Sequence, residues 1–118
     1  MVIDGLTING QFTSGENIGD LGGLSIAHLA YRMSLEGKEA PVIDGLTGDQ
    51  RFFLGWAQVW RSKARDAEAK RLLTIDPHSP PKFRANGAPV NVPAFYEAFD
   101  VKEGDGMYLP ADDQVKIW

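Results

Sequence analysis

The chain has 118 residues, carries 12 Lys and Arg against 16 Asp and Glu, and contains no cysteine. This length suits one compact domain, and the net charge of -4 argues against nucleic acid as a partner, because phosphate binding needs a concentrated basic face. Without cysteine there is no disulfide, thiol nucleophile or cysteine-based zinc site, so any metal must use His, Asp or Glu. No apolar stretch approaches the ~20 residues that span a bilayer, and residues 1–4 lack the basic start of a signal peptide.

The first dozen residues are expected to form a short extended or hairpin arm. Leu6, Ile8 and Phe12 alternate weakly with polar residues around Asn9-Gly10. Asn-Gly is favoured in two-residue hairpin turns, because both of its residues tolerate a positive φ. The sequence therefore predicts a tight turn at residues 9 and 10.

A long helix is expected after this arm. Thr13 and Glu16 have the spacing of a capping box, in which each side chain satisfies a backbone amide. Apolar residues then recur at helical intervals: Ile18, Leu21, Leu24, Ile26, Leu29 and Met33. The pattern predicts a helix from about residue 16 to residue 35, ended by Gly37.

Three glycines fall inside this predicted helix, namely Gly19, Gly22 and Gly23. Each weakens a helix by ~1 kcal/mol relative to alanine, since glycine loses more backbone freedom on folding. Three glycines so close together suggest that another interaction offsets this loss of helix stability. We expect the backbone of another element to approach the helix closely at these positions.

A second helix is expected to supply the main ridge of the core. Thr47 and Gln50 repeat the capping-box spacing. Apolar side chains then fall on one broad face: Phe52, Phe53, Trp56, Val59 and Trp60. Residues 61–71 hold five basic and two acidic side chains, a mixture that usually marks a solvated face.

A stiff loop and a short helix are expected next. Residues 77–81 contain three prolines, which exclude regular structure and fix the backbone around His78, because proline locks its own φ and restricts the residue before it. A short helix is predicted up to about Phe99, with Asn91 as its N-cap and Pro93 in its first turn.

Glu16 and Asp20 are separated by four residues and so share one face of the first helix. One interpretation makes Glu16 a metal ligand and Asp20 the acceptor that orients a ligand histidine. The simpler interpretation is that Glu16 completes the capping box and that both carboxylates favour the positive end of the helix dipole. Spacing alone favours the simpler one.

The chain has two histidines, His28 and His78. A catalytic zinc site takes three protein ligands and keeps one position open. His28 cannot join Glu16, because twelve residues along one helix separate them by ~18 Å. We therefore expect His28 to be a polar-face or hydrogen-bonded core residue, and this chain by itself cannot build an ordinary zinc site.

His78 and Arg84 lie on the proline-stiffened segment and could meet a substrate. Fixed donors aimed at a carbonyl that gains negative charge lower a reaction barrier, and the planar fork of Arg84 suits a backbone carbonyl or a carboxylate. The alternative is a loop histidine beside a surface arginine that pairs with Asp76, and the residue types alone favour this alternative.

At these motifs the sequence resembles the C-terminal part of a neprilysin-like zinc metalloendopeptidase, of peptidase family M13, over about residues 9–118. The matching stretches are Gly-Glu-Asn-Ile-Gly-Asp-Leu-Gly-Gly at residues 15–23, Phe-Phe-Leu-Gly-Trp-Ala-Gln-Val-Trp at 52–60, Asp-Pro-His-Ser-Pro at 76–80 with Phe83-Arg84, and Val-Lys-Ile-Trp at 115–118. Four matches in order are far more specific than any single one.

The resemblance implies a mainly α fold, with residues 1–118 as the C-terminal helical portion of a gluzincin (zincin-like) catalytic domain. It implies that Glu16 is the third zinc ligand and that Asp20 orients a zinc-bound histidine. His78 would hydrogen-bond the oxyanion, and Arg84 would bind a substrate backbone carbonyl. Asn17 matches a position without an assigned role. The other two zinc ligands and the general base belong to an upstream H-E-x-x-H helix, a motif that this chain lacks.

Two positions depart from the family pattern. Gly19 stands where alanine is usual, and Leu21 where asparagine is usual, which affects helix stability and a local hydrogen bond rather than the zinc-facing positions. Animal members have disulfide cysteines in this region, so their absence fits a bacterial type.

The expectation is therefore a fragment of an enzyme that hydrolyses internal peptide bonds with one zinc ion, inactive and without zinc on its own. Its partners would be peptide substrates and the missing N-terminal part of the same polypeptide, and the family suggests a periplasmic, secreted or membrane-anchored location. One alternative is a non-catalytic peptide-binding or regulatory module with the same fold. Another is a structural domain that self-associates through an uncovered apolar face.

Overall fold

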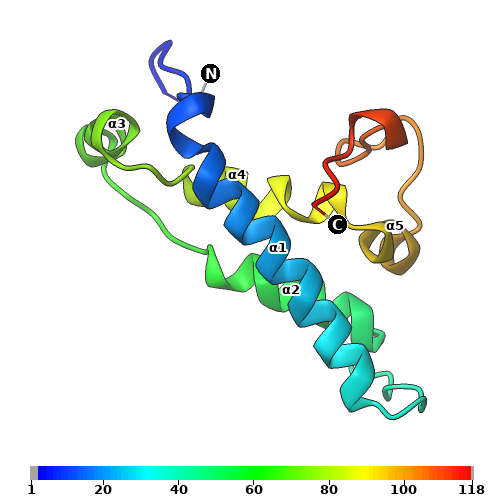
Figure 1. Cartoon of the computed structure of the whole chain (residues 1–118). Coiled ribbons are helices and arrows are strands. Elements are labelled where there is room, and N and C mark those ends of the chain that lie inside the picture. The colour runs from blue at the N-terminus through cyan, green and yellow to red at the C-terminus, as the bar shows by residue number, and fades with distance from the viewer. Residues whose placement is uncertain (1–2, 118) are drawn as a thin grey trace.

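The computed structural model describes residues 3–117, which form α-helices and short 3-10 helices connected by loops (Figure 1). The elements are α1 (Gly10–Ser34), α2 (Gly48–Val59), α3 (Asp66–Ile75), α4 (Pro81–Gly87), η1 (Pro89–Asn91), α5 (Pro93–Phe99) and η2 (Ala111–Asp113). Within the described residues, β pairing is limited to isolated bridges. The predicted mainly α fold is confirmed.

The N-terminus of α1 differs from the prediction. Asn9 is the N-cap, and its side chain accepts a hydrogen bond from the Phe12 amide at 3.2 Å. Thr13 therefore lies inside the helix, where its hydroxyl donates to the Asn9 carbonyl at 3.1 Å. Asparagine caps a helix as well as serine or threonine does, so the predicted capping box of Thr13 and Glu16 is wrong, as is the turn at residues 9 and 10.

The hairpin turn of the N-terminal arm lies earlier, at Asp4 and Gly5, whose φ angles are 45° and 79°. The hexapeptide Val-Ile-Asp-Gly-Leu-Thr occurs at residues 2–7 and again at residues 42–47, a repeat that the sequence analysis missed. Asp44 and Gly45 adopt the same conformation, with φ angles of 52° and 76°. Positive φ at both central positions is what a tight two-residue hairpin requires. Each copy precedes a helix.

The capping box predicted for α2 is confirmed. The Gln50 amide donates to Thr47 Oγ1 at 3.2 Å, and the Thr47 amide donates to Gln50 Oε1 at 3.0 Å. Phe53 is buried as expected, but Val59 is 71% exposed. The apolar face of α2 is thus narrower than predicted, because Val59 points away from the neighbours that cover Trp56 in the same turn.

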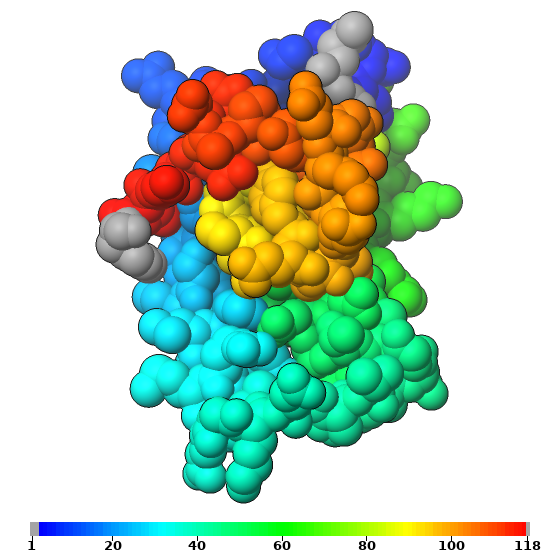
Figure 2. All heavy atoms as spheres, turned by 90° about the vertical axis from the view of Figure 1, so that its right-hand side faces the viewer, coloured from blue at the N-terminus to red at the C-terminus, as the bar shows by residue number. Residues whose placement is uncertain are grey.

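The buried core joins α1, α2, α5 and the turn between α4 and η1. Its members are Leu21, Leu24, Phe53, Ala88, Val92 and Phe95. Figure 2 shows the chain after α4 lying across α1 and α2. The rings of Phe53 and Phe95 meet edge to face, with centroids 5.5 Å apart, a favourable arrangement for aromatic pairs.

The two proline predictions have different outcomes. Residues 76–80 lack regular structure, as expected, but Pro81 begins α4, because a proline at the first helical position has no amide hydrogen bond to lose. Pro93 likewise begins α5, while the N-cap is Val92 rather than Asn91. The Asn91 side chain instead accepts from the Val115 amide at 2.8 Å and so anchors the C-terminal tail.

One face of α1 lies open along its second half. Ile26, Leu29 and Met33 are each more than half exposed, and a Cβ atom added at Gly19 or Gly23 would meet nothing within 4 Å. Within the described structure, the close backbone approach predicted for these two glycines is therefore wrong. No helix among residues 3–117 is long and apolar enough to cross a membrane.

Candidate functional site

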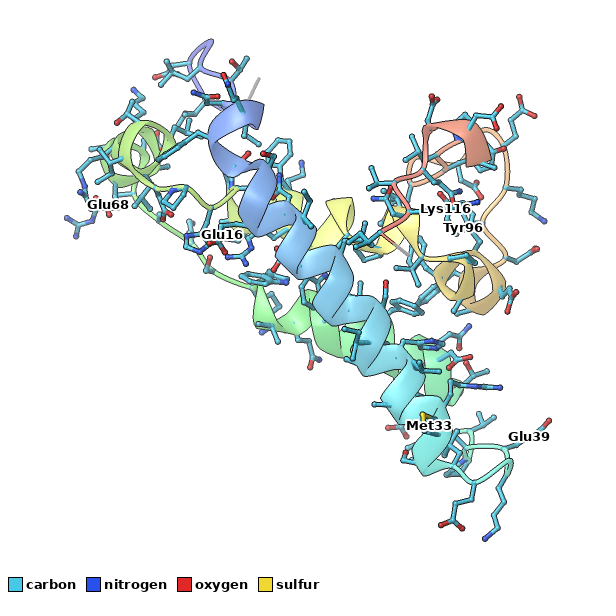
Figure 3. All side chains as sticks on the ribbon, in the orientation of Figure 1. Glu16, Met33, Glu39, Glu68, Tyr96 and Lys116 are labelled. Carbon is cyan, nitrogen blue, oxygen red and sulfur yellow. The ribbon has the colours of Figure 1, made fainter. Side chains whose placement is uncertain are left out.

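The predicted site residues meet where the first half of α1 faces the 76–80 loop and α4. Figure 3 shows Glu16 on this side of α1. Two contacts join the segments: Glu16 with His78, and Asp20 with Arg84. The partners of each pair are more than 60 residues apart in sequence, so the fold is what brings them together.

His78 is held between two carboxylates. Its Nε2 lies 3.1 Å from Glu16 Oε2, and its Nδ1 lies 2.6 Å from Asp76 Oδ1. Asp76 Oδ1 also accepts from the His78 backbone amide at 2.9 Å. Because a neutral imidazole has one N–H group, the ring donates to both carboxylates only when it is protonated. The backbone and ring hydrogen bonds from His78 lower the pKa of Asp76.

Arg84 forms a two-pronged ion pair with Asp20. Its Nε lies 2.6 Å from Asp20 Oδ2, and its Nη2 lies 2.7 Å from Oδ1. The two side chains are 15% and 12% exposed. The guanidinium carbon lies 3.9 Å from the centroid of the Trp60 ring, and the Trp56 indole donates to the Arg84 carbonyl at 3.3 Å. Hydrogen bonding to Asp20 raises the pKa of Arg84.

A third contact lies between these two pairs. Ser79 Oγ donates to Asn17 Oδ1 at 2.8 Å, and Asn17 Nδ2 donates to Thr13 Oγ1 at 3.4 Å. Ser79 and Thr13 are 5% and 3% exposed. Asn17 and Ser79 are the chain neighbours of Glu16 and His78, so this hydrogen bond ties the loop to α1 beside the first pair.

The structure overturns two of the simpler interpretations that residue spacing favoured. Glu16 contacts His78 rather than capping α1, and Arg84 pairs with Asp20 rather than with Asp76. His28 lies away from this region, as expected. Its ring is partly buried, bonds to Asp49 Oδ1 at 3.0 Å and packs against the rings of Phe52 and Phe53.

Three residues of this region were missed by the sequence analysis. Asp76 precedes His78 by two positions, and that short spacing could have identified it as a partner. Ser79 and Trp60 carry no comparable signal, because their partners Asn17 and Arg84 are far away in sequence and the pairing depends on the packing of α1, α2 and α4.

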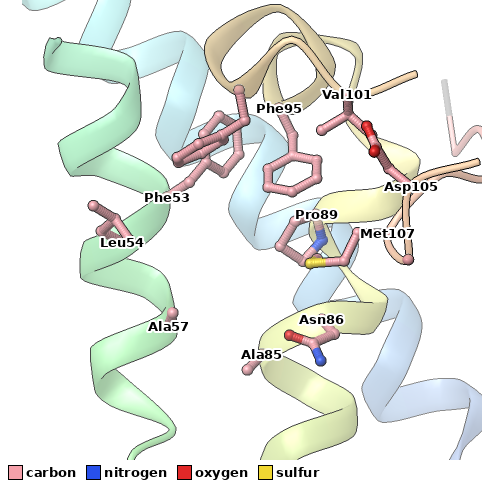
Figure 4. Close-up of a pocket in the computed structure, with 12 residues that line it drawn as sticks. Phe53, Leu54, Ala57, Ala85, Asn86, Pro89, Phe95, Val101, Asp105 and Met107 are labelled. Atoms are coloured by element: carbon pink, nitrogen blue, oxygen red, sulfur yellow. The ribbon is translucent and has the colours of Figure 1, made fainter. Parts of the chain in front are cut away.

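Two hollows adjoin these elements. One of about 550 Å³ is lined by residues of α1, α4 and the tail, among them Asn17, Asp20 and Arg84. The other, of about 440 Å³, is lined mainly by apolar side chains such as Phe95 and Met107 (Figure 4). Both are in the size range of ligand pockets, but the first contains the charged groups that could contact a polar substrate.

The described residues contain no complete metal site. Among residues 3–117, no group of three or more His, Asp or Glu side chains is placed to hold a metal ion. Catalytic zinc takes three protein ligands, including carboxylates. The Glu16 carboxylate is half-exposed, so it could serve as one zinc ligand only if two more came from outside the described residues.

The sequence model of peptidase family M13 matches residues 2–115. This chain belongs to family M13. Among M13 relatives, it is 41% identical over 110 residues to a neutral endopeptidase of Lactococcus lactis, covering 93% of this chain and 16% of that protein. It is 47% identical to neprilysin-1 of Caenorhabditis elegans, covering 86% of this chain and 14% of that protein.

A solved structure supports the same M13 assignment. Zinc metalloprotease Zmp1 of Mycobacterium tuberculosis, in complex with an inhibitor, is 61% identical, with a TM-score of 0.95 over 99% of this chain and 18% of that chain. The fold is thus that of a mainly helical part of an M13 zinc metalloprotease, and the mycobacterial similarity agrees with the predicted bacterial type. The chain spans less than a fifth of the length of these relatives.

Proposed function

We propose that this chain is the C-terminal segment, residues 1–118, of an M13 zinc metalloendopeptidase that hydrolyses internal peptide bonds. One observation carries the proposal: a chain of this family folds so that Glu16 contacts His78 and Asp20 contacts Arg84 at one place. Zinc, when bound, supplies an activated water and polarises the substrate carbonyl. The segment contributes the third zinc ligand and the groups that bind substrate.

Glu16 would hold zinc through its carboxylate, and His78 would stabilise the oxyanion. A carboxylate that binds a metal no longer needs a proton from the ring, so His78 Nε2 becomes free to donate to the substrate oxygen that gains negative charge. Asp76, bound to Nδ1 at 2.6 Å, keeps the ring oriented.

Asp20 and Arg84 would act as a unit at the neighbouring position. The ion pair uses two of the five N–H donors of Arg84, which leaves donors for a backbone carbonyl of the substrate. Each Asp20 oxygen has a second lone pair, so the same carboxylate can orient a zinc-bound histidine from the missing part. Both groups are positioned before any substrate arrives, which lowers the entropic cost of binding.

The missing partner is an upstream H-E-x-x-H helix on the same polypeptide, which would supply two zinc ligands and the general base. The 118-residue chain alone would then lack both zinc and activity. The complete enzyme would bind peptide substrates and work in the periplasm, outside the cell or on a membrane.

The proposal is tested by comparing the 118-residue chain with a longer polypeptide that includes the upstream coding sequence. We expect the chain alone to cleave no peptide, and the longer polypeptide to carry zinc and cut internal bonds of a quenched fluorescent peptide. If the chain alone bound one zinc ion tightly and cleaved the peptide, the claim that it is incomplete would be contradicted. A longer polypeptide that binds the peptide without cutting it would support a non-catalytic module instead.

A further inference from the structure

Asn17 has no part in the chemistry proposed above, yet it makes a hydrogen bond directly beside it. Its side-chain oxygen accepts from Ser79 Oγ at 2.8 Å, across 62 residues of sequence. Asn17 follows Glu16 in the chain, and Ser79 follows His78. The bond therefore connects the two backbone segments that carry a zinc ligand and an oxyanion donor.

The bond continues into α1. Asn17 Nδ2 donates to Thr13 Oγ1 at 3.4 Å, and Thr13 Oγ1 donates to the Asn9 carbonyl at 3.1 Å. Ser79 and Thr13 are the buried polar residues of the described structure. A buried hydroxyl without a partner is costly, so this chain of bonds favours one position of the loop relative to α1.

The loop is stiff, because Pro77 and Pro80 enclose His78 and Ser79. Within residues 3–117, its direct side-chain links to α1 are His78 to Glu16 and Ser79 to Asn17. If Glu16 held zinc, fewer of its lone pairs would remain for His78, and the Ser79–Asn17 bond would still tie the loop to α1.

We propose that Asn17 and Ser79 are positioning residues that set the distance of His78 from the zinc-bound Glu16 during the reaction. This inference rests on the proposed function, and it assigns Asn17 a role that the sequence left open. Asn17 and Ser79 line the hollow beside Asp20 and Arg84, but their side chains bond to each other, so the pair acts on His78 through the loop. Its loss should slow the chemical step, because a catalytic group displaced by about 1 Å can cost up to ~100-fold in rate.

The test uses the longer polypeptide and the variants Asn17→Ala, Ser79→Ala and both together. We expect each single change to lower kcat by about 10- to 100-fold, as loss of a supporting partner at a metal site does, with KM and zinc content unchanged. The double variant should lose no more than either single one, because both changes remove the same bond. Ser79→Thr, which keeps the hydroxyl, should recover most of kcat.

Ser25→Ala is the matched control. Ser25 Oγ donates to the Leu21 carbonyl at 2.8 Å on the same helix but away from the loop, so its loss should leave kcat unchanged. If Ser79→Ala does not fold, Asn17→Ala carries the test, since Asn17 is exposed and its removal opens no cavity.

Three results would overturn this inference without affecting the proposed function. They are a wild-type kcat in Asn17→Ala, kcat losses that multiply in the double variant, and a kcat loss in Ser25→Ala as large as in the other variants. A wild-type longer polypeptide without peptidase activity would overturn the proposed function, and this inference with it.

Discussion

The two halves of α1 differ in what surrounds them. Near its N-terminus, Asn17 and Asp20 bond to the 76–80 loop and α4 through polar contacts made within this chain. Further along, Ile26 and Leu29 are exposed. One helix therefore serves two purposes: its first half forms polar contacts within the chain, and its second half presents an apolar surface that residues 3–117 leave exposed. The first half contacts His78, and the second half contains His28. Substitution of each histidine therefore tests the role of one half.

The largest effect is expected from the two histidines. His78→Ala in the longer polypeptide should lower kcat about 100- to 1000-fold, the cost of losing one oxyanion donor, with zinc content unchanged. His28→Ala should instead lower the free energy of unfolding, because it removes the bond to Asp49 and the packing on Phe53, and should leave kcat unchanged. Steady-state kinetics and urea unfolding of both variants check this. Equal losses of kcat in the two variants would contradict the assignment of catalysis to the first half of α1 and of stability to the second half.

Arg84→Ala should raise KM by about 10-fold or more, since hydrogen bonds to charged groups contribute about 1.5–3 kcal/mol. It also leaves the largely buried Asp20 without its cation, so stability should fall. Arg71→Ala is the control. Arg71 pairs with Glu68 on the exposed surface of α3, and such pairs contribute at most about 1 kcal/mol. An unchanged KM of the Arg84 variant for the fluorescent peptide would contradict a role of Arg84 in substrate binding.

Stability should depend on pH through Asp76. Its pKa is lowered in the folded chain by the hydrogen bonds from His78. A lowered carboxyl pKa contributes stability that is present above its ordinary value of about 4 and is lost as the pH falls through the folded value. Urea unfolding of the 118-residue chain between about pH 6 and about pH 2, roughly the range in which carboxyl groups titrate, should show a smaller acid-induced loss of stability for Asp76→Asn. Identical profiles would mean that this carboxylate is not stabilised by folding.

The smallest effect concerns the open half of α1. We expect the isolated chain to associate weakly through Ile26, Leu29 and Met33, because exposed apolar patches favour contact between molecules. Leu29→Glu should reduce the association seen by light scattering at rising concentration. Ser34→Glu adds the same charge at an exposed polar position of α1 and should change little. A wild-type chain that stays monomeric at every concentration would contradict the expectation.

The sequence predicted α1, α2 and α5 better than their ends, and it did not predict α3 and α4. The periodicity of Leu21 and Leu24 identified α1, and the cap of α2 at Thr47 was correct. Local signals failed where two residues competed for one role: Asn9 rather than Thr13 caps α1, and Asp4-Gly5 rather than Asn9-Gly10 forms the turn. Such competition depends on small energy differences that spacing does not reveal.

For the candidate site, residue spacing suggested the right residues but the wrong partners. Arg84 was paired with nearby Asp76, whereas the fold pairs it with Asp20. The bond from Ser79 to Asn17 was not predicted at all. Both contacts depend on how α4 and its preceding loop pack on α1. Packing of segments distant in sequence is what local patterns cannot give.

The central claim is that Glu16 is a zinc ligand of a larger enzyme, and zinc content measures it most directly. Zinc would be counted in the purified longer polypeptide, wild type and Glu16→Ala, with Glu39→Ala as a control at an exposed glutamate outside the site. The account predicts one zinc ion per molecule in the wild type and the Glu39 variant, and none in Glu16→Ala. A Glu16→Ala protein that keeps its zinc and its peptidase activity would contradict it.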